Sequence, residues 1–95
     1  MSREAQQIGK LAEERVVGLA LQRGLQARLA TREEDGAGKT DVVIEPNVLL
    51  QVSVNNKSRG ARKRLAMRGV YCVEAGSQVS DEHILTRILT ILNQT

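Results

Sequence analysis

The segment DVVIEPNVLLQVSV, residues 41–54, decides the fold of this chain of 95 residues. Its first half is a β-branched run that ends at Pro46 and Asn47, a pair typical of turns, and its second half is again apolar. Two apolar runs joined by a short turn predict neighbouring antiparallel strands. Side chains alternate along a strand, so residues 48, 50, 52 and 54 share one face and residues 49, 51, 53 and 55 share the other.

Helical patterns lie on both sides of this strand pair. Residues 5–23 carry apolar side chains at helical spacing and stop at Gly24, which predicts a long opening helix. Residues 81–93 follow Ser80, a plausible N-cap, and show the clearest amphipathic pattern of the chain.

The remaining segments complete the order of elements. Ser58 predicts the start of a basic helix over residues 59–68, which Gly69 ends. Further strands are expected at residues 25–30 and 70–74, and the polar residues 31–39 between strands are interpreted as a loop. The sequence therefore predicts a single α/β domain over residues 1–95, with the order helix, three strands, helix, strand, helix.

Composition restricts the classes of protein that this chain can represent. A domain of this length buries only about 60 to 65% of its unfolded surface, so dimerisation would help its core. One cysteine, Cys72, excludes an internal disulfide framework, and one histidine, His83, leaves no Cys/His set for structural zinc. The polar start and the short apolar runs predict a cytoplasmic protein without a membrane span.

Basic residues are concentrated in one part of the chain. Six of them and no acidic residue lie between Lys57 and Arg68, whereas the other 83 residues carry 8 basic and 11 acidic residues. A cationic patch on a mildly acidic body indicates an anionic partner on one face, for which nucleic acid is the commonest candidate. A solvated helix face without a partner is the alternative. The patch consists of Lys57, Arg59, Arg62, Lys63, Arg64 and Arg68.

Residues 36–40, Gly-Ala-Gly-Lys-Thr, end like a phosphate-binding loop. Such a loop needs a glycine where this chain has Glu33, and it must follow a strand and open a helix, whereas this segment precedes a strand. We therefore expect no nucleotide cofactor and interpret the segment as a flexible loop whose Lys39 can touch a phosphate. His83 is expected near a helix start, and Cys72 as a buried, inert thiol.

A polar row on the second predicted strand of residues 41–54 requires an explanation. Gln51, Ser53 and Asn55 share one face of an otherwise aliphatic strand, and Asp41 opens its neighbour. Burying such groups without partners costs about 1 to 3 kcal/mol each. They therefore either face solvent on an open sheet surface or line a polar cleft, which we expect to form with the first helix.

The order of elements, the helix glutamates and Asp41 together resemble the PD-(D/E)xK nuclease superfamily. The opening Gly9-Lys10-Leu11-Ala12-Glu13-Glu14-Arg15, followed by Gly24 and Arg28, is similar to the start of its archaeal Holliday junction resolvase branch. The resemblance covers nearly the whole chain and implies a restriction endonuclease-like αβββαβ core with a mixed central sheet, here extended by a C-terminal helix.

The resemblance also implies a magnesium site, with two departures from the family pattern. Glu14, or its neighbour Glu13, matches the helix glutamate, and Asp41 matches the metal-binding aspartate. Gln51 stands where the family has a second carboxylate, so metal affinity should fall, because an amide oxygen cannot offset the charge of Mg²⁺. Ser53 stands where the family has a lysine, and it cannot replace a cation. Lys57 or Lys63 would have to supply that cation from a shifted position.

Three functional hypotheses follow. The first is a protein with this fold that binds duplex or branched DNA through Lys39 and the basic patch and cleaves weakly or not at all. The second is an active Mg²⁺-dependent endonuclease, similar to a Holliday junction resolvase, with a migrated lysine. The third is a homodimeric interaction module in which the apolar stripe of the last helix packs against a partner. The near absence of aromatic residues argues against recognition of single strands by stacking.

Overall fold

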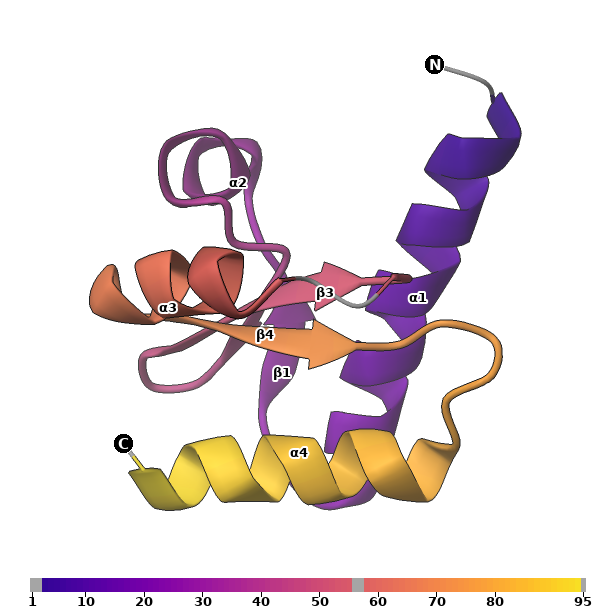
Figure 1. Ribbon diagram of the computed structural model, residues 1–95. Helices are drawn as coiled ribbons and strands as arrows, with labels where there is room; N and C mark the ends of the chain where they lie inside the picture. Colours follow the sequence, from indigo (N-terminus) through magenta and orange to yellow (C-terminus); the bar gives the residue numbers. More distant parts are fainter. Residues whose placement is uncertain (1–2, 56–57, 95) are drawn as a thin grey trace.

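The computed structural model describes residues 3–55 and 58–94, and among these it places the side chains of residues 8–36, 39–55 and 58–94. Four helices and four strands make up this part of the chain (Figure 1). In chain order they are α1 (Arg3–Gln22), β1 (Ala27–Leu29), α2 (Arg32–Gly38), β2 (Val42–Ile44), β3 (Val48–Ser53), α3 (Arg59–Met67), β4 (Val70–Glu74) and α4 (Asp81–Gln94).

The four strands form one mixed sheet in the order β1-β2-β3-β4. The first three strands are antiparallel neighbours, and the predicted pair around Pro46 is confirmed with Val42 opposite Leu50 and Ile44 opposite Val48. β4 runs parallel to β3, with Gln51 opposite Cys72. A parallel neighbour needs a crossover connection, which α3 supplies. The chain is therefore an α/β protein, as predicted.

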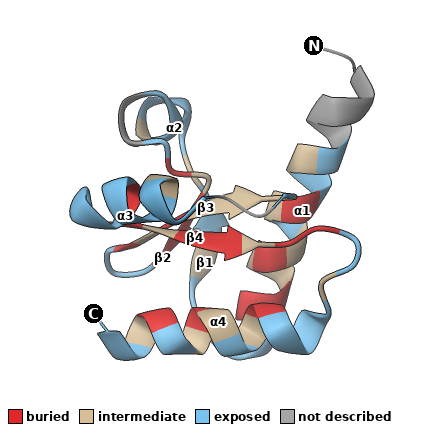
Figure 2. Ribbon diagram, in the orientation of Figure 1, coloured by how far each residue is buried: buried red, intermediate tan, exposed pale blue. Residues whose placement is uncertain are grey.

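The main core lies between the sheet and the helices α1 and α4. Val16 of α1, Leu50 of β3 and Ile88 of α4 are fully buried in one cluster, which shows that both helices cover the same face. Figure 2 shows that the buried residues of α4 lie on its side toward the sheet. The apolar stripe of α4 is therefore occupied by its own domain, and the prediction that it packs against a partner chain is wrong. Homodimerisation by another surface stays a prediction.

α3 covers the opposite face of the sheet and buries much less. Figure 1 shows α3 and α4 on opposite sides of β3 and β4. Leu65 is the one buried side chain of α3, and it packs with Val70, Cys72 and the partly buried Leu49. The buried state predicted for Cys72 is confirmed.

Arg15 joins the loop before α4 to α1. Its guanidinium donates to the carbonyl oxygens of Gly76 at 3.1 Å and Val79 at 2.5 Å, and it lies 2.7 Å from the carboxylate of Asp81. These contacts fix the start of α4 against the first helix. Ser80 caps α4 as predicted, because its hydroxyl accepts from the backbone N–H of His83. The His83 side chain lies in the first turn of α4 and is exposed.

Side chains occupy both edges of the sheet. At the β1 edge, Arg28 donates to Glu34 at 2.8 Å and to Glu45 at 3.3 Å. At the β4 edge, Arg87 of α4 donates to the backbone carbonyl of Cys72 at 3.2 Å. Each outer strand is thus joined to a neighbouring element by an arginine, Arg28 of β1 at one edge and Arg87 of α4 at the other.

The prediction that residues 31–39 form a loop is wrong, because residues 32–38 form the helix α2. Thr31 and Glu34 make a capping box: each side chain accepts from the backbone N–H of the other residue, at 3.2 and 2.8 Å. Hydrogen bonds from Arg28 and from the Thr31 N–H lower the pKa of Glu34 to about 2. The helix start is therefore held by a carboxylate that stays ionised.

No helix in the described part of the chain is both long and apolar enough to cross a membrane.

The close approach of Gly76 to the backbone of Val54, directly after β3, leads to a prediction about stability. A Cβ at position 76 would lie 2.5 Å from the carbonyl oxygen of Val54, whereas a Cβ at Gly18 of α1 would meet nothing within 4 Å. We expect Gly76→Ala to destabilise the fold by about 1 to 3 kcal/mol, because backbone must move to admit the methyl group. We expect Gly18→Ala, the control, to stabilise it by up to about 1 kcal/mol. Urea unfolding measures both, and equal effects of the two variants would contradict the contact.

Candidate nucleic-acid interface

α3 forms because Ser58 caps it and because alanine, leucine and long basic residues favour a helix. The Ser58 hydroxyl accepts from the backbone N–H of Ala61 at 3.2 Å, as the predicted N-cap requires. The first turn carries no acidic residue. The predicted DNA-binding residues of this segment that the structure describes are all exposed, and they are Arg59, Arg62, Lys63, Arg64 and Arg68. Lys57 lies outside the described residues.

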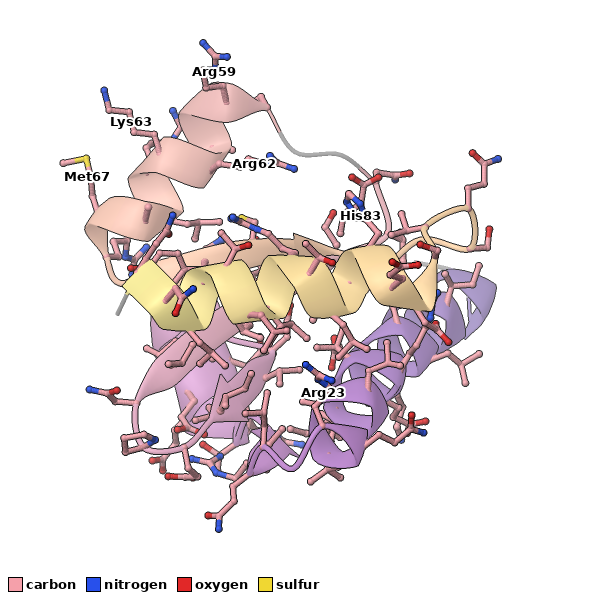
Figure 3. The ribbon with its side chains drawn as sticks, turned by 90° about the horizontal axis from the view of Figure 1, so that it is seen from below. Arg23, Arg59, Arg62, Lys63, Met67 and His83 are labelled. Carbon is pink, nitrogen blue, oxygen red and sulfur yellow. The ribbon has the colours of Figure 1, made fainter. Side chains whose placement is uncertain are left out.

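The basic side chains of α3 leave the helix in different directions. Figure 3 shows Arg59, Lys63 and Met67 pointing away from the body of the protein, and Arg62 leaving the helix on a different side. Met67 has an exposed fraction of 80%. Residues at i, i+4 and i+8 share one side of a helix. Arg59, Lys63 and Met67 have this spacing and form one row, the outer row of α3.

Other basic side chains line a hollow between α3 and the loop before β2. This hollow, the cationic pocket, has a volume of about 350 Å³. Three cations from two separate segments line it, together with one amide and two apolar side chains of α3, and none of these six residues is acidic. They are Lys39, Arg64, Arg68, Gln51, Ala61 and Leu65.

Gln51 fixes the loop that carries Lys39. Its Nε2 donates to the Lys39 carbonyl at 3.2 Å, and the Lys39 N–H donates to the Asp35 carbonyl at 2.9 Å, where α2 ends. Lys39 has φ of 56°, a left-handed conformation that costs a residue with a Cβ about 1 to 2 kcal/mol. The Gln51 Oε1 atom is buried and has no hydrogen-bond partner among the described residues.

A second hollow, the acidic hollow, has a volume of about 220 Å³. Its lining includes three acidic residues, Glu13 of α1, Asp35 of α2 and Asp41 before β2, and one basic residue, Arg32. The Asp41 Oδ2 atom accepts from the backbone N–H of Val52 at 2.8 Å, which extends the pairing of β3 beyond the end of β2. Burial, the Asp41 carboxylate and the Asp35 carboxylate raise the pKa of Glu13 above its usual value.

Of the two helix glutamates, Glu13 is the one that lines the acidic hollow with Asp41. Glu14, the other glutamate assigned to the catalytic and metal site, is exposed and does not line the acidic hollow. Val16 and Ala20 of α1 are fully buried, and they lie three and seven residues after Glu13. Residues at this spacing share one side of a helix, so Glu13 borders the buried side of α1. That spacing was a signal in the sequence that would have distinguished the two glutamates.

The polar row of β3 lies on the α3 side of the sheet. Val52 and Val54 pack on the core that α1 covers, whereas Gln51 lines the cationic pocket with α3. The prediction that Gln51 and Ser53 form a cleft with the first helix is therefore wrong. Ser53 instead turns locally, because its hydroxyl donates to the Asn55 carbonyl and accepts from the Asn55 N–H.

The described residues do not fit the magnesium site that the resemblance implies. They contain no group of three or more histidine, cysteine, aspartate or glutamate side chains arranged to hold a metal ion. The two carboxylates Glu13 and Asp41 share a hollow, but Gln51 is turned toward Lys39 in the other pocket. Of the two lysines expected there, Lys63 points away from the protein and does not line the acidic hollow, and Lys57 lies outside the described residues. Of the metal ligands that the resemblance implies, Glu13 and Asp41 thus line one hollow and Gln51 lines another.

Comparison with known proteins adds no relative: no family model matches the chain, and neither a curated protein nor a solved structure matches it.

The pKa of Glu13 predicts a dependence of stability on pH. Because folding raises this pKa, folding favours the protonated form, and the ionised form at neutral pH destabilises the protein relative to low pH. We expect Glu13→Gln to raise the free energy of unfolding at pH 7, and this gain to shrink as the pH falls below the ordinary range of a carboxyl group. Urea unfolding at pH 7 and pH 3.5 (about 1 unit below that range) measures it. Glu14→Gln is the control, and an equal gain there would contradict the assignment of Glu13.

Proposed function

We propose that this protein binds duplex or branched DNA through α3 and Lys39, on a restriction endonuclease-like fold whose cleavage activity is weak or lost. The observation that carries the proposal is the contrast between the two faces of the sheet. One face is buried under α1 and α4, whereas the other presents a helix with exposed basic side chains and a cationic pocket. Such a concentration of cations suits a partner with closely spaced phosphates.

The element order supports the nuclease-like fold. Apart from the additional α2, the order from α1 to β4 is the αβββαβ order on which the resemblance rests. Glu13 of the first helix and Asp41 directly before the second strand line the same hollow, which also agrees with it. These are similarities of arrangement, and the particular fold remains part of the proposal.

The distribution of aromatic residues favours duplex or branched DNA over single strands. Tyr71 is the one aromatic residue of the chain, and it is partly buried and packs against the main core. Single-strand platforms stack bases on exposed aromatic rings. Recognition by α3 therefore relies on phosphate contacts, which a duplex offers at regular spacing.

DNA binding should be electrostatic and should depend on α3. On a duplex with phosphorylated ends and three to five phosphate contacts, the slope of log K against log salt should be roughly −3 to −5, and each of Arg62→Ala and Arg64→Ala should reduce its magnitude by about one. Arg23→Ala is the control, since Arg23 is exposed at the end of α1 (Figure 3), and it should leave the slope unchanged. Fluorescence anisotropy over a salt series measures this, and unchanged binding after charge reversal of Arg62 and Arg64 would disprove the proposed interface.

The carboxylate pair in the acidic hollow favours a second candidate function, a Mg²⁺-dependent endonuclease. Asp41→Asn separates the two, because the amide oxygen keeps the bond to the Val52 N–H while the charge is lost. We expect wild type to nick supercoiled or branched DNA in Mg²⁺ or Mn²⁺ no faster than Asp41→Asn does. Strong wild-type cleavage that disappears in Asp41→Asn and persists in Glu14→Gln would establish the endonuclease instead.

A further inference from the structure

The cationic pocket differs from the outer row of α3 in shape and in origin. Arg59 and Lys63 project from a convex helix surface, where a continuous DNA backbone can pass (Figure 3). Lys39 and Arg64 instead line one hollow of about 350 Å³ from separate segments of the chain. A group bound there meets cations from two segments of the chain, whereas the outer row offers cations of α3 alone.

The charge of the pocket suits an anion with more than one negative charge. Lys39, Arg64 and Arg68 contribute three positive charges, and no acidic side chain belongs to the lining. An internal phosphodiester carries one negative charge, whereas a phosphomonoester carries about 1.5 to 2 at neutral pH and offers three acceptor oxygens. Arginine donors bind such oxygens in charge-assisted hydrogen bonds.

Hydrogen bonds and packing hold the two segments that line the cationic pocket. Gln51 holds the Lys39 backbone, and the end of α2 holds it from the other side, so the lysine starts from a fixed position. On the helix side, the Arg64 guanidinium turns back toward Gly60, where an added Cβ would lie 3.7 Å from its Nη1. The apolar Leu65 anchors this part of α3 to the sheet. The backbone on both sides of the pocket is therefore held in place before a ligand binds, which lowers the conformational cost of binding.

From these observations we infer that the cationic pocket binds a phosphomonoester, and that its source is the terminal phosphate of a DNA strand. This inference rests on the proposed function, because it assigns the outer row to the continuous backbone and the pocket to a strand end. A terminal phosphate can enter a hollow, since only one side of it is attached to the strand. An internal phosphate is attached on both sides and is better suited to the convex row.

The test compares duplexes of one sequence that end in a 5′-phosphate, a 3′-phosphate or hydroxyl groups only. At equal salt, we expect wild type to bind one phosphorylated end about tenfold more tightly than the hydroxyl duplex, because charged hydrogen bonds of this kind support at least that factor. Equal affinity for all three duplexes would overturn the inference while leaving the proposed DNA binding intact. The end that is preferred identifies the strand terminus.

Matched variants separate the pocket from the outer row. Arg64→Gln and Lys39→Asn should remove the preference for the phosphorylated end, and asparagine tolerates the left-handed backbone at position 39. Arg59→Gln and Lys63→Gln should weaken all three duplexes by the same factor and keep the preference. A preference that persists in Arg64→Gln, with a circular dichroism spectrum like that of wild type, would overturn the assignment to this pocket.

A titration with inorganic phosphate tests the pocket without DNA. In NMR spectra of wild type, phosphate should shift the backbone amide signals of Lys39, Arg64 and Arg68, and chloride at matched ionic strength should not. No shift at about 10 mM phosphate, well above the 1 mM dissociation constant of a weak ligand, would overturn the inference. Shifts by phosphate in a protein that binds none of the duplexes would support the pocket, with free phosphate or a small phosphomonoester as its source, and would contradict the proposed function.

Discussion

The structure depends on the pairing of β3 along both of its sides. β3 is antiparallel to β2 and parallel to β4, so its side chains must alternate strictly between two faces of the sheet. Leu50 goes to the face that α1 and α4 bury, and Gln51 to the face that α3 covers. A shift of one residue would exchange these faces and place a glutamine in the main core. The fixed register therefore separates an aliphatic side of the molecule from a polar one.

The two faces also differ in how much of them is covered. Two long helices bury the aliphatic face, whereas on the other face α3 contributes one buried side chain, Leu65, which packs with Val70 and Cys72. A short helix with so little apolar contact contributes less to stability, and its remaining positions are free to carry charge. This explains how a chain with a net charge of +3 concentrates cations on one element without disturbing its core.

Alternation and capping made most of the fold predictable, whereas side-chain contacts between distant segments were harder to predict. The turn at Pro46, the Ser58 cap and the amphipathic pattern of α4 are local signals, and the structure agrees with each of them. The capping box that starts α2 was also local, but the glycines that follow it suggested a loop. The side of the sheet that Gln51 occupies depends on where α3 packs. That packing is a tertiary contact between α3 and the sheet. The family pattern, which has a carboxylate where this chain has Gln51, did not indicate it.

The arginines at the sheet edges affect whether separate molecules of this protein can aggregate. An outer strand exposes backbone groups that can pair with a strand of another molecule, which is a common route to aggregation. Arg87 bonds to the Cys72 carbonyl of β4, and the ion pairs of Arg28 surround the three-residue strand β1. An incoming strand would have to break these contacts and bring its own backbone next to a charged side chain. The sheet is thereby protected from growth at its margins, even though four strands leave two edges unpaired.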